Sequence, residues 1–295
     1  MSVPRLFDQQ LLIRRRERAA RAPDAAFFLH EEVARRLVER LDDIRRPFAQ
    51  VLDLGCGPGF LAQRLERRAG TLRVIRLDPS HAMVRRAGGM GVVAGLEALP
   101  FAPDRFDAVL SAFALHWVND LPGLLAQIRL CLKPDGLLLL ALAGGETLGE
   151  LAQALWSAEL ALYRGMRLRL PPRIDLADAA ALLQRAGFAL PVADLDRITV
   201  RYADPLALLQ DLHAMGESQV LRQGPKGFFP RRLLALTLQH YRDRFRDGEG
   251  RVPASFEILY LTGWKPHPDQ PRPLPRGSGQ VSLARLLGGR RGGTG

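Results

Sequence analysis

The chain has 295 residues, and 47% of them are hydrophobic, which is typical of a globular protein with a substantial core. Its longest apolar run, Leu137–Ala143, is far shorter than the about 20 residues that a membrane-spanning helix needs, so no transmembrane segment is expected. The formal net charge is +11, but only three of the 42 basic residues are lysine, and the arginines are spread along the chain. We therefore expect an acidic protein partner or surface, and no nucleic acid.

Cysteine and histidine usage argues against a disulfide framework and against a metal site. The two cysteines, Cys56 and Cys131, belong to no CxxC pair. The six histidines are scattered without the spacing of metal ligands, so no metal is predicted. The N-terminal region lacks an apolar signal core, and its arginine-rich stretch over 14–23 contains Glu17, which favours an exposed helix over a mitochondrial transit peptide.

In chain order, hydrophobic periodicity first predicts helical structure over 11–46. A regular alternation of strands and helices follows. The predicted strands are 50–54, 72–77, 91–94, 106–111 and 137–143, and the predicted helices between them are 60–68, 81–87 and 121–132. Alternation with short connections predicts an α/β fold, with a parallel sheet covered by helices on both faces.

The second half of the chain has a different pattern. Helical spacing predominates, and two stretches alternate as strands do. The predicted helices are 147–163, 175–185, 205–215 and 231–245, and the predicted strands are 188–202 and 255–264. Residues from 266 onward are rich in Pro, Gly and Arg, and this composition predicts poor order at the very end of the chain.

The stretch VLDLGCGPGF carries the strongest local signal. A predicted strand enters it, Gly55, Gly57 and Gly59 follow at alternate positions, and a predicted helix leaves it. Glycine allows positive φ and lets a ligand approach the backbone closely. No Gly-Lys-Ser/Thr follows, which excludes a P-loop. With Asp53 before it, the loop resembles the first motif of class I S-adenosylmethionine-dependent methyltransferases, which implies cofactor contacts from Asp53, the glycines and Cys56.

A second acid ends the next predicted strand. Asp78 closes the segment RVIRLD, 25 residues after Asp53, where an acid can accept both hydroxyls of a ribose. The resemblance to class I methyltransferases assigns its neighbour Pro79 to the same cofactor site and implies that Met83 packs on the adenine. The alternative for Asp78 is a helix cap.

The adenine and methionine ends of the implied cofactor site are less regular. Many class I members carry an acid after the third strand, where this chain has Gly95, while Glu97 is kept nearby. Glu97 is therefore the implied adenine contact. The segment DRFDAVLSAFALHW is similar to the family's fourth strand, whose end lies beside the methionine part of the cofactor, and this places Ser111 at that end.

Six further segments are similar to one branch of this superfamily, the mitochondrial complex I assembly factors that act as protein-arginine hydroxylases, together with their bacterial relatives. The segments are LHWVNDLPG, LKPDG, GGETLGEL, DLHAMGES, VPASFEILYLTGWK and RPLPRGSGQVS. The resemblance implies a Rossmann-like fold with a seven-stranded, mostly parallel sheet, in which 255–264 forms the antiparallel last strand or its neighbour. It also implies S-adenosyl-L-methionine as the cofactor and a helical lid over the site.

The resemblance divides the chain into five parts. They are an N-terminal helical segment (1–46), the S-adenosylmethionine-binding core (47–203), the helical lid (204–250), a final core strand (251–265) and a partly disordered C-terminal extension (266–295). Without a convincing transit peptide, the expected location is the bacterial cytoplasm, or the mitochondrial matrix if the chain is eukaryotic.

Four residues are candidates for the substrate side of the site. His116 is the candidate catalytic base, and a pocket-lining role and simple packing remain open alternatives. Trp117 is expected either to shape the pocket, where its face would favour a substrate guanidinium, or to pack in the core. Glu146 and Glu217 are candidate carboxylates for an incoming arginine, with helix capping as the alternative for Glu146.

Three functions remain open at this point. The resemblance implies hydroxylation of an arginine in a respiratory complex I subunit during assembly of the complex. One alternative is transfer of the cofactor's methyl group to a carboxylate or another small nucleophile, as in the carrier-protein O-methyltransferase of biotin synthesis. The other is a non-catalytic assembly chaperone. The residues themselves indicate no mechanism for oxygen chemistry.

Overall fold

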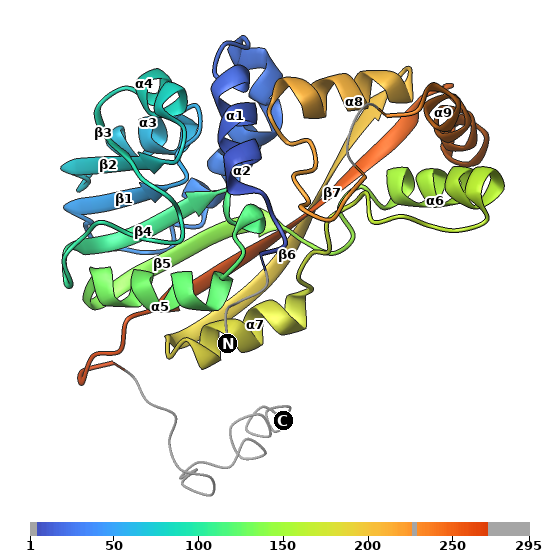
Figure 1. Cartoon of the computed structure of the whole chain (residues 1–295). Coiled ribbons are helices and arrows are strands. Elements are labelled where there is room, and N and C mark those ends of the chain that lie inside the picture. The colour runs from blue at the N-terminus through green and yellow to red at the C-terminus, as the bar shows by residue number, and fades with distance from the viewer. Residues whose placement is uncertain (1–4, 226–228, 271–295) are drawn as a thin grey trace, which may run out of the picture.

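One sheet forms the centre of the molecule. The computed structural model describes residues 5–225 and 229–270. In this part of the chain the strands are β1 (Gln50–Leu54), β2 (Arg73–Asp78), β3 (Met90–Val93), β4 (Phe106–Ala112), β5 (Leu132–Ala143), β6 (Ala189–Tyr202) and β7 (Val252–Trp264). They form one 7-stranded sheet in the order β3-β2-β1-β4-β5-β7-β6 (Figure 1).

The direction of the strands follows the predicted pattern. Strands β3, β2, β1, β4 and β5 pair in parallel. Strand β7 runs antiparallel to both of its neighbours, β5 and β6. The predicted seven-stranded, mostly parallel sheet is confirmed, and the strand predicted over 255–264 is the antiparallel β7, which begins three residues earlier than predicted.

Helices cover both faces of the sheet (Figure 1). One face carries α2 (Phe28–Glu39), α3 (Phe60–Glu66) and α4 (His81–Ala87), and the other carries α5 (Leu121–Cys131) and α7 (Leu176–Arg185). Strand β5 contributes to both layers because successive side chains of a strand point to opposite faces. Its odd-numbered apolar residues from 137 to 143 join the core under α2 and α3, and the even-numbered ones join the core under α5 and α7.

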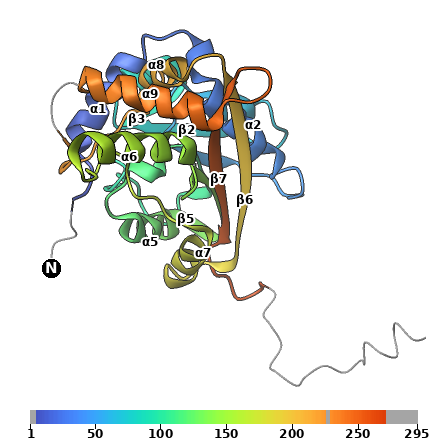
Figure 2. The same cartoon turned by 90° about the vertical axis from the view of Figure 1, so that its right-hand side faces the viewer.

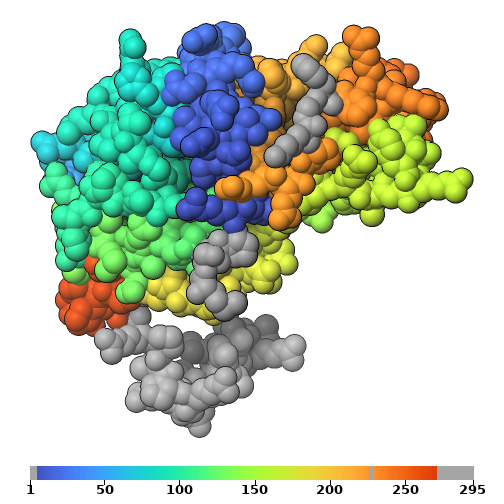
Figure 3. Space-filling view, in the orientation of Figure 1, coloured from blue at the N-terminus to red at the C-terminus, as the bar shows by residue number. Residues whose placement is uncertain are grey.

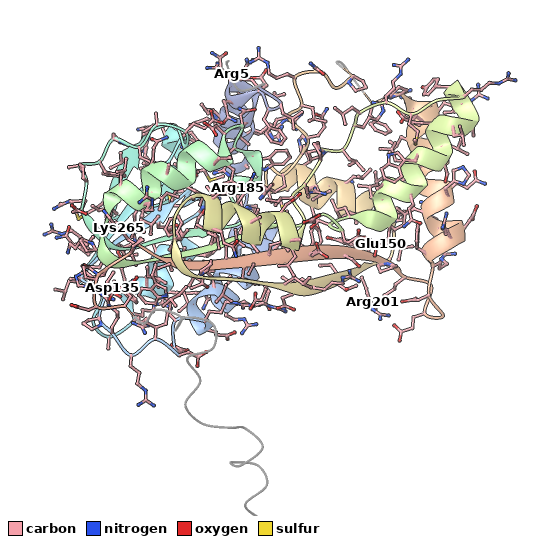
Figure 4. The ribbon with its side chains drawn as sticks, turned by 90° about the horizontal axis from the view of Figure 1, so that it is seen from below. Arg5, Asp135, Glu150, Arg185, Arg201 and Lys265 are labelled. Atoms are coloured by element: carbon pink, nitrogen blue, oxygen red, sulfur yellow. The ribbon has the colours of Figure 1, made fainter. Side chains whose placement is uncertain are left out.

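The two ends of the sheet differ in what they carry (Figure 4). At one end the backbone N–H of Asp135 donates to the carbonyl of Lys265 at 3.1 Å. At the opposite end, where the parallel strands finish, Glu150 begins α6 (Gly149–Tyr163) and accepts from the hydroxyl of Ser255 at 2.6 Å. Ligands of open parallel sheets bind beyond the carboxyl ends of the strands. The binding site is therefore expected at the end that carries Glu150.

The predicted helical stretch 11–46 contains two helices and a short turn. Helix α1 (Gln9–Ala19) is capped by the side chain of Asp8, and a 3₁₀ turn, η1 (Asp24–Phe27), separates it from α2. Pro23 precedes η1, which accounts for the break, because the residue before a proline disfavours helical geometry.

The chain before α1 pairs with a distant segment. Phe7 forms a β-bridge with Leu221, which follows α8 (Pro205–Ala214). The N–H of Asp8 donates to the carbonyl of Val220 at 2.8 Å, and the N–H of Arg222 donates to the carbonyl of Leu6 at 2.9 Å. The N-terminal helices and the segment after α8 therefore form one structural unit above the sheet, which we call the cap (residues 5–39 and 205–225).

The last helix of the described chain lies beside α8 of the cap, since Nη2 of Arg242 is 2.9 Å from a carboxylate oxygen of Asp204, the residue that caps α8. Helix α9 (Arg231–Phe245) packs beside α6 through Leu155, Ala158 and Leu233, as Figures 1 and 2 both show. No helix in the described ranges is long and apolar enough to cross a membrane. Most of the predicted C-terminal extension lies outside the described residues, so its disorder stays a prediction.

Candidate functional site

The three glycines between β1 and α3 have different physical roles. All three have positive φ, at 74°, 49° and 93° in chain order. A Cβ on Gly55 would lie 2.4 Å from the Cβ of Ala114, and one on Gly59 would lie 2.8 Å from Ala87. For a Cβ on Gly57 the nearest atom would be the carbonyl oxygen of Gly55, 4.0 Å away. Gly55 and Gly59 thus permit close packing of the chain, whereas Gly57 leaves room beside the backbone for a ligand.

Asp78, at the end of β2, is fully buried and fully engaged. Its Oδ1 accepts from the N–H of Ser80 at 2.9 Å, and its Oδ2 accepts from the N–H of Gly57 at 3.1 Å. The same Oδ2 accepts from Nη1 of Arg16, on α1, at 2.5 Å. Burial would lower the pKa of Arg16, but the negative charges of Asp78 and Glu217 raise it. The cap therefore contributes a guanidinium to the acid that the sequence assigns to a ribose.

Asp53, in β1, uses only one of its carboxylate oxygens for hydrogen bonding within the described residues. Its Oδ2 accepts from the N–H of Ala62 at 3.2 Å, while its buried Oδ1 has no hydrogen-bond partner in the part of the chain that the structure describes. Burial raises the pKa of Asp53 to about 7, and the charge of Arg76 opposes that rise. An unpartnered buried carboxylate oxygen beside a pocket suits a cationic ligand.

Two pockets adjoin at the carboxyl end of the strands. The first is small, about 20 Å³, and is lined by Asp53, the glycine loop and three aromatic walls, Phe27, Phe60 and Phe113. The second, of about 470 Å³, opens between the start of α1 and the loops that follow β2 and β3. Its lining residues include Phe7, Gln9, Ile13, Pro79, Gly95, Leu96, Glu97 and Asn119.

The Arg16–Asp78 ion pair lies where the pockets meet. Arg16 lines the first pocket, while Ile13 from the preceding turn of α1 and Pro79 line the second. The second pocket also has free space at Gly95, where no atom lies within 4 Å of the place a Cβ would take. The two pockets share no lining residue, so this ion pair separates the two halves of one candidate groove.

Glu217, in the segment after α8, organises a buried cluster behind the first pocket. Its Oε2 accepts from Nε1 of Trp117 at 2.7 Å and lies 3.0 Å from Nε2 of His116. Its Oε1 lies 3.3 Å from Nε2 of His30, on α2. Although burial favours the neutral acid, hydrogen bonds from His116 and His30 hold the pKa of Glu217 well below its usual range. Burial lowers the pKa of His116, so at neutral pH an ionised carboxylate faces a neutral imidazole.

The cluster brings together two histidines that the sequence shows as scattered. His30 lines the first pocket, and its Nδ1 has no hydrogen-bond partner among the described residues. His116 lies behind Glu217 and does not line the pocket. Within the described ranges, no group of three or more His, Cys, Asp or Glu side chains could hold a metal ion.

The structure gathers most of the cofactor residues named from the sequence. Asp53, Gly55, Cys56, Gly57 and Met83 line the first pocket, and Pro79 and Glu97 line the second. Met83 therefore lies beside the glycine loop and not beside the space near Gly95 that was expected to hold adenine. Ser111 is buried within β4 and lines neither pocket.

The substrate-side residues are distributed differently from the expectation. Trp117 is 2% exposed and packs edge-on against Phe7, so it lies behind the first pocket and does not form its wall. Glu217 lines the first pocket. Glu146 is exposed and lines neither pocket, because the turn after β5 points it toward solvent.

Several site residues were missed from the sequence, and the lid was placed too narrowly. Arg16, Phe27 and His30 come from a stretch predicted only as amphipathic helix, whereas Phe60 and Phe113 belong to segments that the resemblance already placed at the cofactor site. The predicted lid range contains α9, but no residue of α9 lines either pocket. The pockets are covered by the cap, whose N-terminal half lies about 190 residues earlier in the chain than α8. No local signal in the sequence indicates that pairing.

Several known proteins are similar to this chain in sequence. A family model described as a methyltransferase domain matches residues 52–140. The mitochondrial arginine hydroxylase NDUFAF5 of Danio rerio is 37% identical over 288 residues, which cover 95% of this chain and 89% of the relative. The Homo sapiens protein of the same name is 38% identical over a match that covers 95% of this chain and 83% of the relative. A malonyl-[acyl-carrier protein] O-methyltransferase of Gallionella capsiferriformans is 33% identical over 279 residues, covering 89% and 93%.

Solved structures share the fold. A Bacillus halodurans protein superposes with a TM-score of 0.55 at 18% identity, covering 78% of this chain and 99% of the other. The YcgJ protein of Bacillus subtilis gives a TM-score of 0.54 at 19% identity, covering 78% and 98%. From the sheet order, the glycine loop and these relatives, the chain belongs to the class I S-adenosylmethionine-dependent methyltransferase superfamily, in the branch that includes the NDUFAF5 arginine hydroxylases.

Proposed function

We propose that this protein binds S-adenosyl-L-methionine along the groove formed by the two pockets. The space beside Gly57 and the spare oxygen of Asp53 support a place for the cationic amino acid part in the first pocket. The free space at Gly95 and the side chain of Glu97 support a place for the adenine in the second. When bound, this cofactor supplies an electrophilic methyl group on a sulfonium.

Asp78 is the proposed acceptor of the ribose hydroxyls. It lies between the pockets, and its Oδ2 is occupied by Arg16. The ribose therefore competes with the guanidinium for this carboxylate, and cofactor binding is coupled to the position of α1. A carboxylate that accepts hydrogen bonds from two hydroxyl groups is hard to replace with a neutral group.

We further propose that the protein hydroxylates an arginine of a protein substrate, a subunit of respiratory complex I. The observation that carries this proposal is the 37–38% identity to arginine hydroxylases over 95% of the chain. The first pocket suits the guanidinium of such a substrate, because the buried carboxylate of Glu217 stands behind aromatic walls.

The residues around Glu217 have distinct proposed roles. Glu217 fixes the orientation of His30 and His116 through its two oxygens. His30 faces the pocket and has a free Nδ1 among the described residues, so it is the group placed to hold or move a proton of the substrate. His116 acts through Glu217 as a positioning residue. The proposed compartment is that of complex I assembly, the cytoplasm of a bacterium or the mitochondrial matrix.

Mass spectrometry of complex I from a deletion strain tests the arginine proposal. The wild-type gene should restore a subunit arginine that is heavier by one oxygen atom, and the deletion strain should lack it. An arginine-modification pattern that is identical in both strains would overturn the proposal.

A second candidate function is methyl transfer to a carboxylate. It is favoured by the Gallionella capsiferriformans relative, which matches 89% of this chain. Transfer of a labelled methyl group to a malonyl carrier protein, or complementation of a biotin-requiring strain, would support it. A third candidate, a cofactor-bound assembly chaperone, requires that Asp78→Ala still supports complex assembly.

A further inference from the structure

Helix α6 is apolar on two opposite faces. One face packs against α9 through Leu155 and Ala158. The other carries Trp156, Leu160 and Tyr163, which are 45%, 60% and 43% exposed. These three residues follow helical spacing of four and three, so they lie along one side of the helix. Apolar residues on opposite sides of a helix are normally both buried, yet these three side chains are at least 43% exposed, and the guanidinium of Arg167 lies over one of them, 5.3 Å from the centre of the Tyr163 ring.

The apolar surface continues beyond the helix. Met166 and Leu168 are 67% and 44% exposed in the chain that leaves α6. We call Trp156, Leu160, Tyr163, Met166 and Leu168 together the α6 face. Phe229, 41% exposed, extends it across the guanidinium of Arg169, which lies 5.1 Å from the centre of the Phe229 ring. In Figure 3 this region forms the yellow-green projection at the side of the molecule.

The charges around the α6 face are all of one sign. Arg164 and Arg167 are exposed within it, and Arg231 and Arg232 are exposed at the start of the neighbouring α9. The one acid of α6 beyond its first turn, Glu159, is buried and accepts from Nε of Arg169 at 2.6 Å. The exposed part of this surface therefore offers positive charge with no carboxylate to balance it.

We propose that the α6 face docks the protein substrate, through a surface whose apolar residues are flanked by acidic side chains. This inference rests on the proposed function only in requiring a protein substrate. Aromatic residues, Met and Arg are the side chains enriched at protein interfaces, and Lys, Glu and Asp are the ones depleted there, which is the composition of this face. The excess of arginine selects an acidic partner.

The α6 face also connects to the cluster behind the first pocket. The carbonyl of Leu168 lies 3.2 Å from the place a Cβ on Gly224 would take, and the Cβ of Leu221 lies 3.3 Å from the same place. Leu221 and Gly224 belong to the same segment of the cap as Glu217. A protein that covers the α6 face therefore contacts Leu168, which packs on the segment that carries the carboxylate of the substrate pocket.

Binding measurements on the full-length protein test the docking proposal. The test variant is Trp156→Glu with Leu160→Glu, and the control is Leu72→Glu, which changes a residue that is 85% exposed at the start of β2. The two probes are the complex I subunit that carries the candidate arginine and malonyl-acyl carrier protein, which is the acidic substrate of the alternative function. The test variant should bind its probe at least about tenfold more weakly, a loss of about 1.4 kcal/mol, because it places two carboxylates in the middle of the apolar surface. The control should bind as the wild type does.

The outcomes separate the docking proposal from the proposed function. If the wild type binds the carrier protein and the test variant does not, the docking proposal is supported, even if no complex I arginine is modified. The docking proposal is overturned if wild type and test variant bind the probes equally, or if neither of them binds any probe. A variant that only turns a dimer into a monomer, or only loses binding to vesicles of anionic phospholipid, would also overturn it. Unchanged binding of S-adenosylmethionine by the variant excludes misfolding as the cause.

Discussion

The glycine-loop half of the site and the cap are built in contrasting ways. In the first, one turn after β1 and one acid at the end of β2 supply the contacts, and the residues lie within 25 positions of each other. In the second, His30 on α2 and Glu217 after α8 meet His116 from the 3₁₀ turn after β4, and His116 and Glu217 are 101 positions apart. Local geometry specifies the cofactor half, whereas only long-range packing specifies the cap, so the two halves should respond differently to substitution.

The largest effect should come from the ion pair that joins the two halves. Arg16→Gln leaves Asp78 buried without its charged partner, which should lower the free energy of unfolding by about 3 kcal/mol. Chemical denaturation with and without S-adenosylmethionine measures this. The ligand should restore much of the loss, because the ribose hydroxyls then occupy the carboxylate. A variant as stable as the wild type without ligand would show that the pair contributes nothing.

The cap's carboxylate should matter to catalysis more than to cofactor binding. Glu217→Gln removes the charge that holds His30 and His116, so arginine hydroxylation should fall by about 100-fold while S-adenosylmethionine binds within about threefold of the wild type. Single-turnover assays and calorimetry measure the two quantities. Glu146→Gln is the matched control, because that carboxylate is exposed outside the pockets. Equal losses in both variants would refute the role of the cluster.

Within the cofactor half, Gly57→Ala should weaken S-adenosylmethionine binding by about tenfold and leave the substrate side intact. The new Cβ enters the space that faces the pocket, and φ of 49° strains any residue with a side chain by about 1–2 kcal/mol. Gly59→Ala, which meets Ala87 instead, should lower the melting temperature without a specific loss of ligand affinity. If both substitutions changed only stability, Gly57 would not border the ligand.

The smallest expected effect is a pH dependence of cofactor binding. The pKa of Asp53 is about 7 because the group is buried, so its carboxyl is largely neutral below that pH and ionised above it. If the anion attracts the cofactor's amino group, raising the pH from 6.5 to 7.5 should tighten binding by about threefold. Asp53→Asn should remove this dependence. Calorimetry at the two pH values measures the affinity of both proteins for S-adenosylmethionine. If the affinity of the variant depends on pH as that of the wild type does, Asp53 does not bind the amino group.

The sequence predicted the glycine-loop half of the site better than it predicted the cap. The strands of the parallel part and the glycine loop could be inferred, because alternation of apolar residues and one turn motif determine them locally. The antiparallel direction of β7 was implied only by the family resemblance, and the order of the strands was not predicted. The position of Glu217 beside His116 and Trp117 could not be inferred from spacing, since it depends on how the segment after α8 pairs with Phe7. Trp117 shows the limit well, because the sequence left both a pocket wall and core packing open for it, and the structure buries it against Phe7.

Arg16 shows a second limit. It is one of several arginines in a helix whose periodicity indicates only an amphipathic surface, yet it is 5% exposed and bound to Asp78. A sequence pattern predicts which face of a helix is apolar, but it does not predict which charged residue will be buried against a partner from another element. Glu146 is the opposite case, since a suggestive motif placed a carboxylate in the site and the turn after β5 leaves it in solvent.

Calorimetric titration of S-adenosylmethionine into the wild type and Asp78→Ala tests the central claim most directly. The account gives Asp78 the ribose hydroxyls, so the wild type should bind with a one-to-one stoichiometry and the variant should bind at least about 100-fold more weakly. Equal affinity in the two proteins would contradict the assignment of the groove to this cofactor.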